Sequence, residues 1–191
     1  YVDKILLSGN KYFTDQEIFK KMKLKKPSLF VRNEYSNKIF KQDVQNIIGY
    51  YKTHGFLDVT INPSYEKQNN NYINISYDIN EGFQYYFNEL IIFGNKFLSD
   101  NEIKKYFLKK NNNTYNPNLI TKELISLKRQ YLKNGMLKIK VTQELLYKKN
   151  QISLRLNISE GIEYKINEIN IHGLKTIKSR FITRELIFNK N

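Results

Sequence analysis

The sequence predicts an α+β fold made of tandem β-α-α-β-β units, in which helices cover one face of each small sheet. The stretch Ile5–Ile18 recurs as Leu90–Ile103, and the turn glycines of the two copies, Gly9 and Gly94, are 85 residues apart. Strand and helix periodicities follow in the same order after each copy. Self-similarity at a long, fixed spacing indicates an array of one structural unit, and alternating strands indicate a sheet with one buried face.

The first unit begins with a strand and a short helix. Ile5 and Leu7 stand two residues apart, as on the buried face of a strand, and the Gly-Asn pair at 9–10 ends the strand with a turn. Thr14 and Glu17 form the pattern of a capping box, in which each side chain bonds to the backbone of the other residue. This pattern predicts a helix over residues 15–22.

A longer helix and two strands complete the first unit. Ser36 is a suitable N-cap, and Gly55 stands where a helix ends in a left-handed residue. One apolar stripe with helical spacing lies between them: Phe40, Val44, Ile47, Ile48 and Tyr51. Alternation then predicts strands over residues 57–65 and 73–79. Because proline cannot donate to a ladder, Pro63 places the first of these strands at the edge of the sheet.

The second unit repeats this order. A strand over 90–92 precedes a second capping box at Ser99 and Glu102, Asn116 caps a long helix, and Gly135 ends it. The apolar positions are Ile120, Leu124, Leu127 and Tyr131 in the helix, and Leu137, Ile139, Val141, Ile152, Leu154, Leu156 and Ile158 in the two strands.

Glu-Gly pairs close the units, at Glu81-Gly82 and Glu160-Gly161. We therefore predict one unit over residues 1–82, a second over 83–161, and the start of a third, incomplete unit over 162–191. The third copy offers a strand around Ile169 and part of a helix near its end. The linkers are short and not rich in glycine or serine, so we expect limited hinges.

Composition excludes several kinds of site. The absence of cysteine excludes disulfides, zinc–thiolate sites and a cysteine nucleophile. The net charge of +14 fits a polyanionic partner, either nucleic acid or an anionic lipid surface. It also fits compositional drift, because Lys, Asn, Ile and Tyr, which have A/T-rich codons, are all abundant. The lysines are scattered, which favours drift.

We expect no catalytic residue, metal or cofactor. The two histidines, His54 and His172, have no second histidine or cysteine three or four residues away. Glu81 and Glu160 recur, but they end equivalent strands in separate units and cannot form a catalytic pair. No phosphate-binding, dinucleotide-binding or nucleophile-elbow motif occurs.

The ordered landmarks of the two units resemble the POTRA (polypeptide-transport-associated) domain. These landmarks are Gly-Asn at 9–10 and 94–95, Tyr-x-x-x-Gly at Tyr51–Gly55 and Tyr131–Gly135, Asp58, and Glu-Gly at 81–82 and 160–161. The third copy departs from the pattern, since Gly173 is followed by Leu174 rather than asparagine. Met136 stands where the family usually has an aromatic residue.

The resemblance implies a three-stranded mixed sheet covered on one face by two helices. It also implies a non-enzymatic periplasmic arm of a BamA-like outer-membrane assembly factor of a Gram-negative bacterium. Such an arm precedes its own C-terminal β-barrel and binds unfolded outer-membrane proteins or accessory lipoproteins. A TamA-type or two-partner-secretion transporter is the alternative within the family.

A basic nucleic-acid-binding adaptor is the alternative from another class. It is disfavoured because Tyr51, Tyr77 and Tyr131 fall on core stripes and are not free to stack on bases. An anionic lipid surface stays open as a partner.

The candidate site is the exposed strand edge, where an extended client can add a strand through main-chain bonds. The predicted peptide-binding residues are Leu57, Asp58, Val59, Thr60, Ile61, Asn62, Leu137, Lys138, Ile139, Lys140, Val141 and Thr142. The alternative is that the edges are protected, since Pro63, Lys138 and Lys140 are residues that block edge pairing. A second candidate is the loop Leu29-Phe30-Val31, which either packs inward or contacts a partner.

Overall fold

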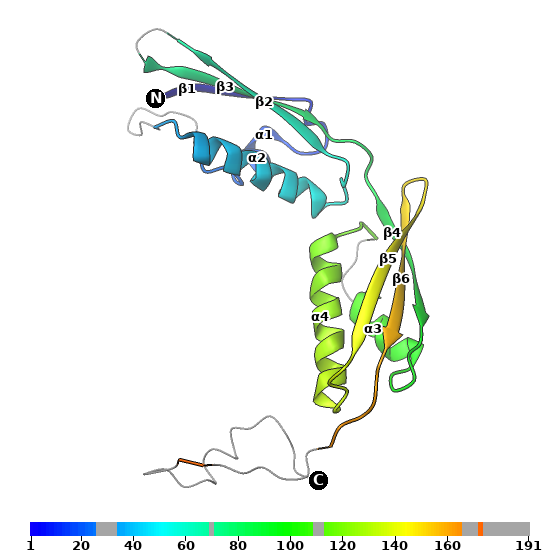
Figure 1. The fold of residues 1–191 in the computed structure, drawn as a ribbon. Coiled ribbons are helices and arrows are strands. Elements are labelled where there is room, and N and C mark those ends of the chain that lie inside the picture. The colour runs from blue at the N-terminus through cyan, green and yellow to red at the C-terminus, as the bar shows by residue number, and fades with distance from the viewer. Residues whose placement is uncertain (26–33, 69–70, 109–112, 166–171, 174–191) are drawn as a thin grey trace. The chain divides into compact units, whose positions relative to one another are not determined.

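The structure is a computed structural model that describes residues 1–25, 34–68, 71–108, 113–165 and 172–173 (Figure 1). The first repeat comprises β1 (Val2–Ser8), α1 (Asp15–Phe19), α2 (Asn37–Lys52), β2 (Thr60–Lys67) and β3 (Ile73–Asn80). The second repeat comprises β4 (Tyr86–Phe93), α3 (Asp100–Leu108), α4 (Pro117–Lys133), β5 (Lys140–Lys148) and β6 (Gln151–Ser159). The predicted α+β class and the tandem β-α-α-β-β order are confirmed.

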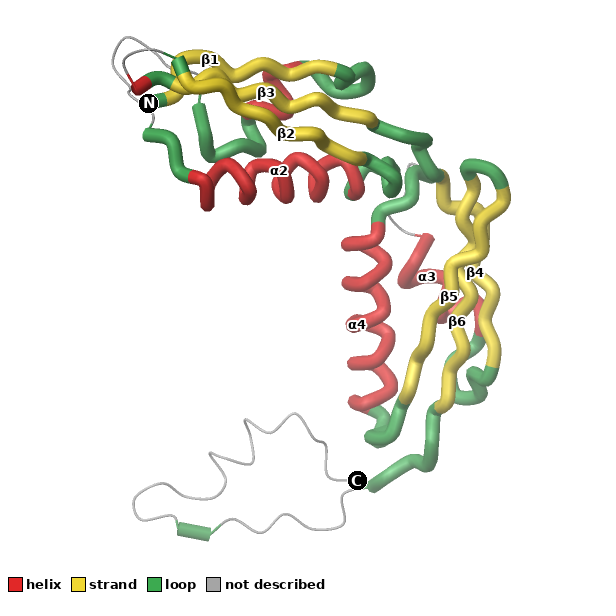
Figure 2. Tube along the Cα trace, turned by 45° about the horizontal axis from the view of Figure 1, so that its top comes forward, coloured by secondary structure: helices red, strands yellow, loops and turns green. Residues whose placement is uncertain are grey.

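Each repeat has its own three-stranded sheet, in the order β1-β3-β2 and β4-β6-β5. In the first sheet β1 pairs with β3 in parallel and β2 pairs with β3 antiparallel, so the sheet is mixed. The antiparallel register sets Ile61 opposite Ile79 and Pro63 opposite Tyr77. Pro63 therefore lies in an edge strand, as predicted. The helices of each repeat lie along one face of its sheet (Figure 2).

The cores follow from the two periodicities of the sequence. In the first repeat, Ile75 and Tyr77 of β3 are fully buried against Ile47 and Tyr51 of α2. In the second repeat, the fully buried side chains are Ile103 on α3, Leu127 and Tyr131 on α4, and Ile152, Leu154 and Leu156 on β6. Each such side chain stabilises the fold by about 2 kcal/mol, so the helices stay on the apolar face of each sheet.

A glycine turn joins the first strand of each repeat to its first helix. Gly9 has a φ of 79° and Gly94 a φ of 80°, a region that favours glycine. A Cβ atom on Gly9 would collide with the backbone carbonyl of Ile79, and one on Gly94 with that of Ile158. Glycine is therefore required at both turns, because the third strand passes too close for any side chain.

The glutamate that ends β3 fastens this turn to the sheet. Glu81 Oε1 accepts hydrogen bonds from the backbone N–H groups of Lys11 and Tyr12, both 2.9 Å long, and from the Tyr51 hydroxyl at 2.9 Å. Burial, with this hydrogen bond, raises the pKa of Tyr51. The carboxylate of Glu81, directly after β3, thus links the turn that follows β1 to α2.

Glu160 repeats two of these three bonds in the second repeat. Its Oε1 accepts from the N–H groups of Lys96 at 2.7 Å and Phe97 at 2.9 Å. The equivalent tyrosine, Tyr131, is buried beside Glu160, and both burial and this carboxylate raise its pKa. Its hydroxyl nevertheless lacks a partner with hydrogen-bond geometry among the described residues.

Both predicted capping boxes form. The N–H of Thr14 donates to Glu17 Oε2 at 2.9 Å, and the N–H of Ser99 donates to Glu102 Oε2 at 2.8 Å. These bonds, together with those from the two hydroxyl groups, hold the pKa values of both glutamates below their usual range. Asn116 also caps α4, through Oδ1 bonds from the N–H groups two and three residues on.

Some predicted boundaries are wrong. The helix predicted over residues 15–22 ends at Phe19. The N–H groups of Lys21 and Met22 then bind carbonyls three residues back, and those of Lys23 and Leu24 bind the carboxylate of Asp43. Asp43 lies on α2 and is completely buried. Ser36 takes the N-cap position of α2, but its side chain makes no capping bond.

The loop Leu29-Phe30-Val31 lies outside the described residues. So do the strand and helix expected in the third copy, and the incomplete unit over 162–191 stays a prediction.

Candidate functional site

The strand edge predicted in the first repeat lies on β2. Thr60, Ile61 and Asn62 pair with β3 on one side, opposite Asn80, Ile79 and Asp78. Within the part of the chain that the structure describes, no strand pairs with the other side of β2. Its outer backbone groups are therefore available to a further strand.

Leu57, Asp58 and Val59 do not belong to this edge, which corrects the prediction that the strand starts at Leu57. They form a turn after α2, in which the N–H of Leu57 donates to the carbonyl of Gly55 at 3.1 Å. Their alternation resembles that of a strand only because Val59 is buried in the core. The usable edge begins at Thr60 and runs on to Lys67.

Pro63 interrupts the edge of β2. A proline fits inside an edge strand when its nitrogen faces away from the ladder. The outer row of backbone groups then has one missing N–H donor in its first half. A client strand added to β2 would lose one main-chain bond at this position.

An aromatic cluster borders the β2 edge on the helix-covered face. Tyr65 of β2 has its ring 5.6 Å from that of Tyr35 and 6.0 Å from that of Phe40, between centroids. Tyr65 is 48% exposed, whereas Phe40 is buried. We name Tyr35, Phe40 and Tyr65 the aromatic shelf. Tyr65 already stood in the predicted strand, but Tyr35 gave no signal in the sequence.

The second predicted edge lies on β5. Lys140, Val141 and Thr142 begin this strand, which runs to Lys148 and is the outer strand of its sheet. Gln143 stands where β2 has Pro63, so the outer row of N–H donors is complete over the middle of β5. The predicted peptide-binding residues end at Thr142, one residue before Gln143.

Leu137, Lys138 and Ile139 precede β5 and form a turn, which again corrects the predicted start of the strand. The N–H of Leu137 donates to the carbonyl of Gly135 at 2.9 Å, and that of Ile139 to Met136 at 3.2 Å. Lys138 therefore does not guard the strand edge.

Charges on β5 are only partly neutralised. Glu144 of β5 forms an ion pair with Arg155 of β6, with an N–O distance of 2.9 Å. Lys140 and Lys148 at the two ends of β5 are exposed. These lysines disfavour the pairing of two copies of the edge while leaving its centre open.

His54 makes local contacts within the first repeat. His54 Nδ1 lies 2.8 Å from the carbonyl oxygen of Tyr50, and its ring packs against Phe13 with centroids 4.9 Å apart. The described residues contain no group of three or more His, Cys, Asp or Glu side chains placed to hold a metal ion. Nor do they contain a helix with the length and apolar character needed to cross a membrane.

Three of the core tyrosines are unavailable for base stacking. Tyr51, Tyr77 and Tyr131 are fully buried. Burial also raises the pKa of Tyr77, and it raises that of Tyr115 to about 12. These rings belong to the two cores and are not free to stack on nucleobases.

Comparisons with known proteins agree with this architecture. The profile of the POTRA family, described as "Surface antigen variable number repeat", matches residues 1–82 and 85–161. The sequence is 26% identical to the "Outer membrane protein assembly factor BamA" of Buchnera aphidicola subsp. Acyrthosiphon pisum (strain APS), over 100% of this chain and 32% of that protein. The chain thus spans about a third of the length of this relative.

Two solved structures share the fold. One is the crystal structure of Haemophilus influenzae BamA POTRA3-5, with a TM-score of 0.64, 18% identity, and coverage of 99% of this chain and 77% of that one. The other is the N-terminal domain of Omp85 from the cyanobacterium Thermosynechococcus elongatus, with a TM-score of 0.56, 14% identity and the same coverage. The chain therefore belongs to the POTRA family, and its two described repeats are POTRA domains of the kind that BamA-type assembly factors carry.

Proposed function

We propose that this chain is the periplasmic POTRA array of an outer-membrane β-barrel assembly factor of a Gram-negative bacterium. In this proposal it binds unfolded outer-membrane proteins, in part by strand addition, and delivers them to a C-terminal β-barrel of the same protein. Accessory assembly lipoproteins are its further partners. The observation that carries the proposal is that no described strand pairs with the outer side of β2 or of β5, and the relationship to BamA supports it.

Strand addition suits a protein that handles many clients. Main-chain bonds recognise an extended segment whatever its sequence, and only alternate side chains contact the receptor. Each main-chain bond contributes about 1 kcal/mol net, so one short edge binds weakly. Two edges on one chain strengthen binding through a high effective concentration of the second site.

The two edges differ in a way that predicts a division of labour. β5 offers an uninterrupted row of donors and should hold a client mainly by its backbone. β2 lacks a donor at Pro63 but has the aromatic shelf beside it, where client side chains can pack. We therefore expect β5 to be less selective for client sequence than β2.

An isotope-labelled NMR titration of the chain tests this proposal. The probe is a synthetic peptide of about ten residues that copies an outer-membrane strand with alternating polarity. We expect amide shifts along Thr60–Lys67 and Lys140–Lys148. A matched peptide with N-methyl groups along both edges keeps its side chains but has no main-chain donors left for either β2 or β5, so it should no longer shift these residues.

A reciprocal exchange of one residue supplies the control. Gln143→Pro should weaken binding at β5 to the level of β2, because proline is already accommodated at the equivalent position of β2. Pro63→Gln should strengthen binding at β2. Shifts confined to other surfaces, or equal binding of the N-methylated peptide, would contradict strand addition.

A further inference from the structure

A surface on α4 combines exposed aliphatic side chains with unpaired cations. Ile125 is 48% exposed and Leu132 is 41% exposed, although both belong to a helix whose other face forms the core. They are seven residues apart, so they lie on one line along the helix, about 10 Å from each other. The exposed cations around them are Lys122, Lys128, Arg129 and Lys133. We name these six residues the α4 surface.

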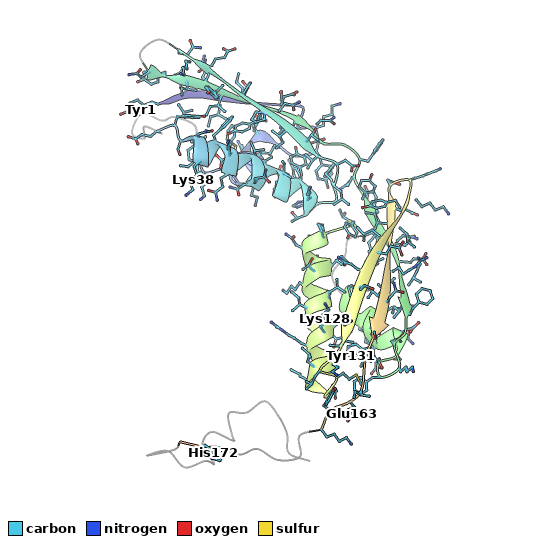
Figure 3. All side chains as sticks on the ribbon, in the orientation of Figure 1. Tyr1, Lys38, Lys128, Tyr131, Glu163 and His172 are labelled. Atoms are coloured by element: carbon cyan, nitrogen blue, oxygen red, sulfur yellow. The ribbon has the colours of Figure 1, made fainter. Side chains whose placement is uncertain are left out.

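The cations of the α4 surface have no partners among the described residues. None of the four makes an ion pair or a side-chain hydrogen bond there. Helical spacing places Lys128 on one side of the line from Ile125 to Leu132, and Lys122, Arg129 and Lys133 on the other. Helical spacing places Glu123 about 160° around the helix from Ile125, away from this face. Figure 3 marks Lys128 and Tyr131 on α4 and Lys38 on α2.

The equivalent helix of the first repeat lacks this surface. In α2, Gln45 stands in the place of Ile125 and Lys52 in the place of Leu132, counting from Tyr51 and Tyr131. The exposed residues of α2 include no aliphatic side chain and are Asn37, Lys38, Lys41, Gln42, Gln45, Gly49 and Lys52. The apolar line on α4 is therefore not a requirement of the fold.

We propose that the α4 surface docks an acidic amphipathic helix of a partner protein. Two aliphatic side chains at heptad spacing are the arrangement that a second helix covers by inserting its own side chains between them. The flanking cations complement carboxylates on both sides of such a helix. The stretch from Lys122 to Lys133 matches a partner segment of about three turns.

The surface chemistry favours a protein over a membrane. Interfacial helices usually carry Trp or Phe among the side chains that enter the lipid, and this face carries neither. Two half-exposed aliphatic residues give little area to insert, but they suffice for the centre of a helix–helix contact whose rim is charged. The proposal goes beyond strand addition, because the α4 surface is separate from the β5 edge in its residues and in its mode of recognition.

Fluorescence anisotropy with the whole chain tests the proposal. The probe is a labelled helical peptide of about fourteen residues, with two leucines seven apart, glutamates flanking them and alanines elsewhere. Its control has the same composition with the leucines on opposite faces. At about 150 mM ionic strength we expect the patterned peptide to bind about tenfold more tightly than the control.

Variants assign the preference to the α4 surface. The two peptides should bind equally to Ile125→Ser/Leu132→Ser. The single variant Ile125→Lys should also reduce the preference, and it tests the same surface if the double variant does not fold. The matched change on α2, Gln45→Ser/Lys52→Ser, should leave the preference unchanged. Lys128→Ser/Arg129→Ser should weaken both peptides and flatten their salt dependence.

Two outcomes would overturn the proposal. One is equal binding of the two peptides to the unchanged chain, which would mean that charge alone attracts them. The other is a preference that persists in Ile125→Ser/Leu132→Ser. Vesicles containing phosphatidylglycerol serve as the competing probe: if the serine variant weakens vesicle binding while the peptides show no preference, the surface contacts a membrane and not a helix.

Discussion

The end of the sheet beside Gly55 is filled with aromatic rings in the first repeat, while smaller side chains occupy the same positions in the second. The residues are Tyr12, Phe13, Tyr50, His54 and Phe56 in the first repeat, and Phe97, Leu98, Gln130, Asn134 and Met136 in the second. The ring of Phe13 contacts the rings of both Tyr50 and His54, with centroids 4.5 and 4.9 Å away. The same backbone therefore accommodates two different packings.

Positions that touch the backbone of another element do not vary between the repeats. Gly9 and Gly94 both lie against a backbone carbonyl of the third strand of their repeat. Glu81 and Glu160 both accept hydrogen bonds from two backbone N–H groups. A side chain that packs only against other side chains can be exchanged if its neighbours adjust. A residue that packs against the backbone has no such freedom. We call the two glycines and two glutamates the common frame of the repeats; the other core positions can differ between them.

The largest effect should come from breaking this frame at its glycines. Gly9→Ala should destabilise the first repeat by about 3–5 kcal/mol, because it adds backbone strain at positive φ to a collision with the carbonyl of Ile79. Gly94→Ala should do the same to the second repeat. Denaturant titration followed by NMR, which resolves each repeat, measures the two losses separately. A small loss at either glycine would show that the turn relaxes and is not part of a common frame.

A second test removes an interaction of the first repeat that the described part of the second repeat does not show. Asp43→Ala takes away the buried acceptor for the N–H groups of Lys23 and Leu24, at 2.6 and 2.9 Å. We expect a loss of about 3 kcal/mol, because hydrogen bonds to a charged acceptor are lost and buried donors are left unpaired. Native-state hydrogen exchange should show the loss in the first repeat alone.

The matched control lies at the equivalent position of α4. Glu123 is half-buried and makes no hydrogen bond to a described residue. Glu123→Ala should therefore cost less than about 1 kcal/mol. If Asp43→Ala were equally mild, the buried carboxylate would not stabilise the segment that follows α1.

Local signals predicted the parts of the fold that depend on neighbours in sequence. The capping boxes at Thr14 and Ser99 placed two helix starts, and Pro63 placed β2 at the edge of its sheet. Each of these rests on a rule that acts within a few residues. The predicted start of β2 at Leu57 was wrong because a buried turn residue, Val59, imitates the alternation of a strand.

Contacts between distant residues could not be predicted in the same way. Glu81 recurs as Glu160, but nothing in the sequence says that Glu81 binds the turn at Lys11, 70 residues earlier. The burial of Asp43 inside an apolar stripe was equally hidden, because a carboxylate there gives no apolar signal. The α4 surface was visible in principle, since Ile125 interrupts the polar side of a regular helix.

A third test compares the buried tyrosines of the two repeats. The Tyr51 hydroxyl donates to Glu81 at 2.9 Å, whereas the Tyr131 hydroxyl is buried without such a bond. Tyr51→Phe should cost about 1.5 kcal/mol. Tyr131→Phe should be neutral or slightly stabilising, because it removes an unsatisfied polar group. Equal costs for the two substitutions, measured by denaturant titration of each repeat, would mean that Tyr131 does bond to Glu160.

The smallest effect should be one that the repeats share. The pKa values of Glu17 and Glu102 lie below the usual value of 4.5, because each accepts hydrogen bonds from its cap residue. A carboxyl group whose pKa falls on folding stabilises the native state above its unfolded pKa, and this contribution is lost as the pH falls through the folded pKa. The free energy of unfolding of both repeats should therefore fall below about pH 4.5.

Glutamine can still close a capping box but does not titrate there. Glu17→Gln should therefore flatten the acid limb of the stability–pH curve of the first repeat, and Glu102→Gln should flatten that of the second. Flattening in only one repeat would show that the boxes, although alike in geometry, do not contribute alike to the two folds.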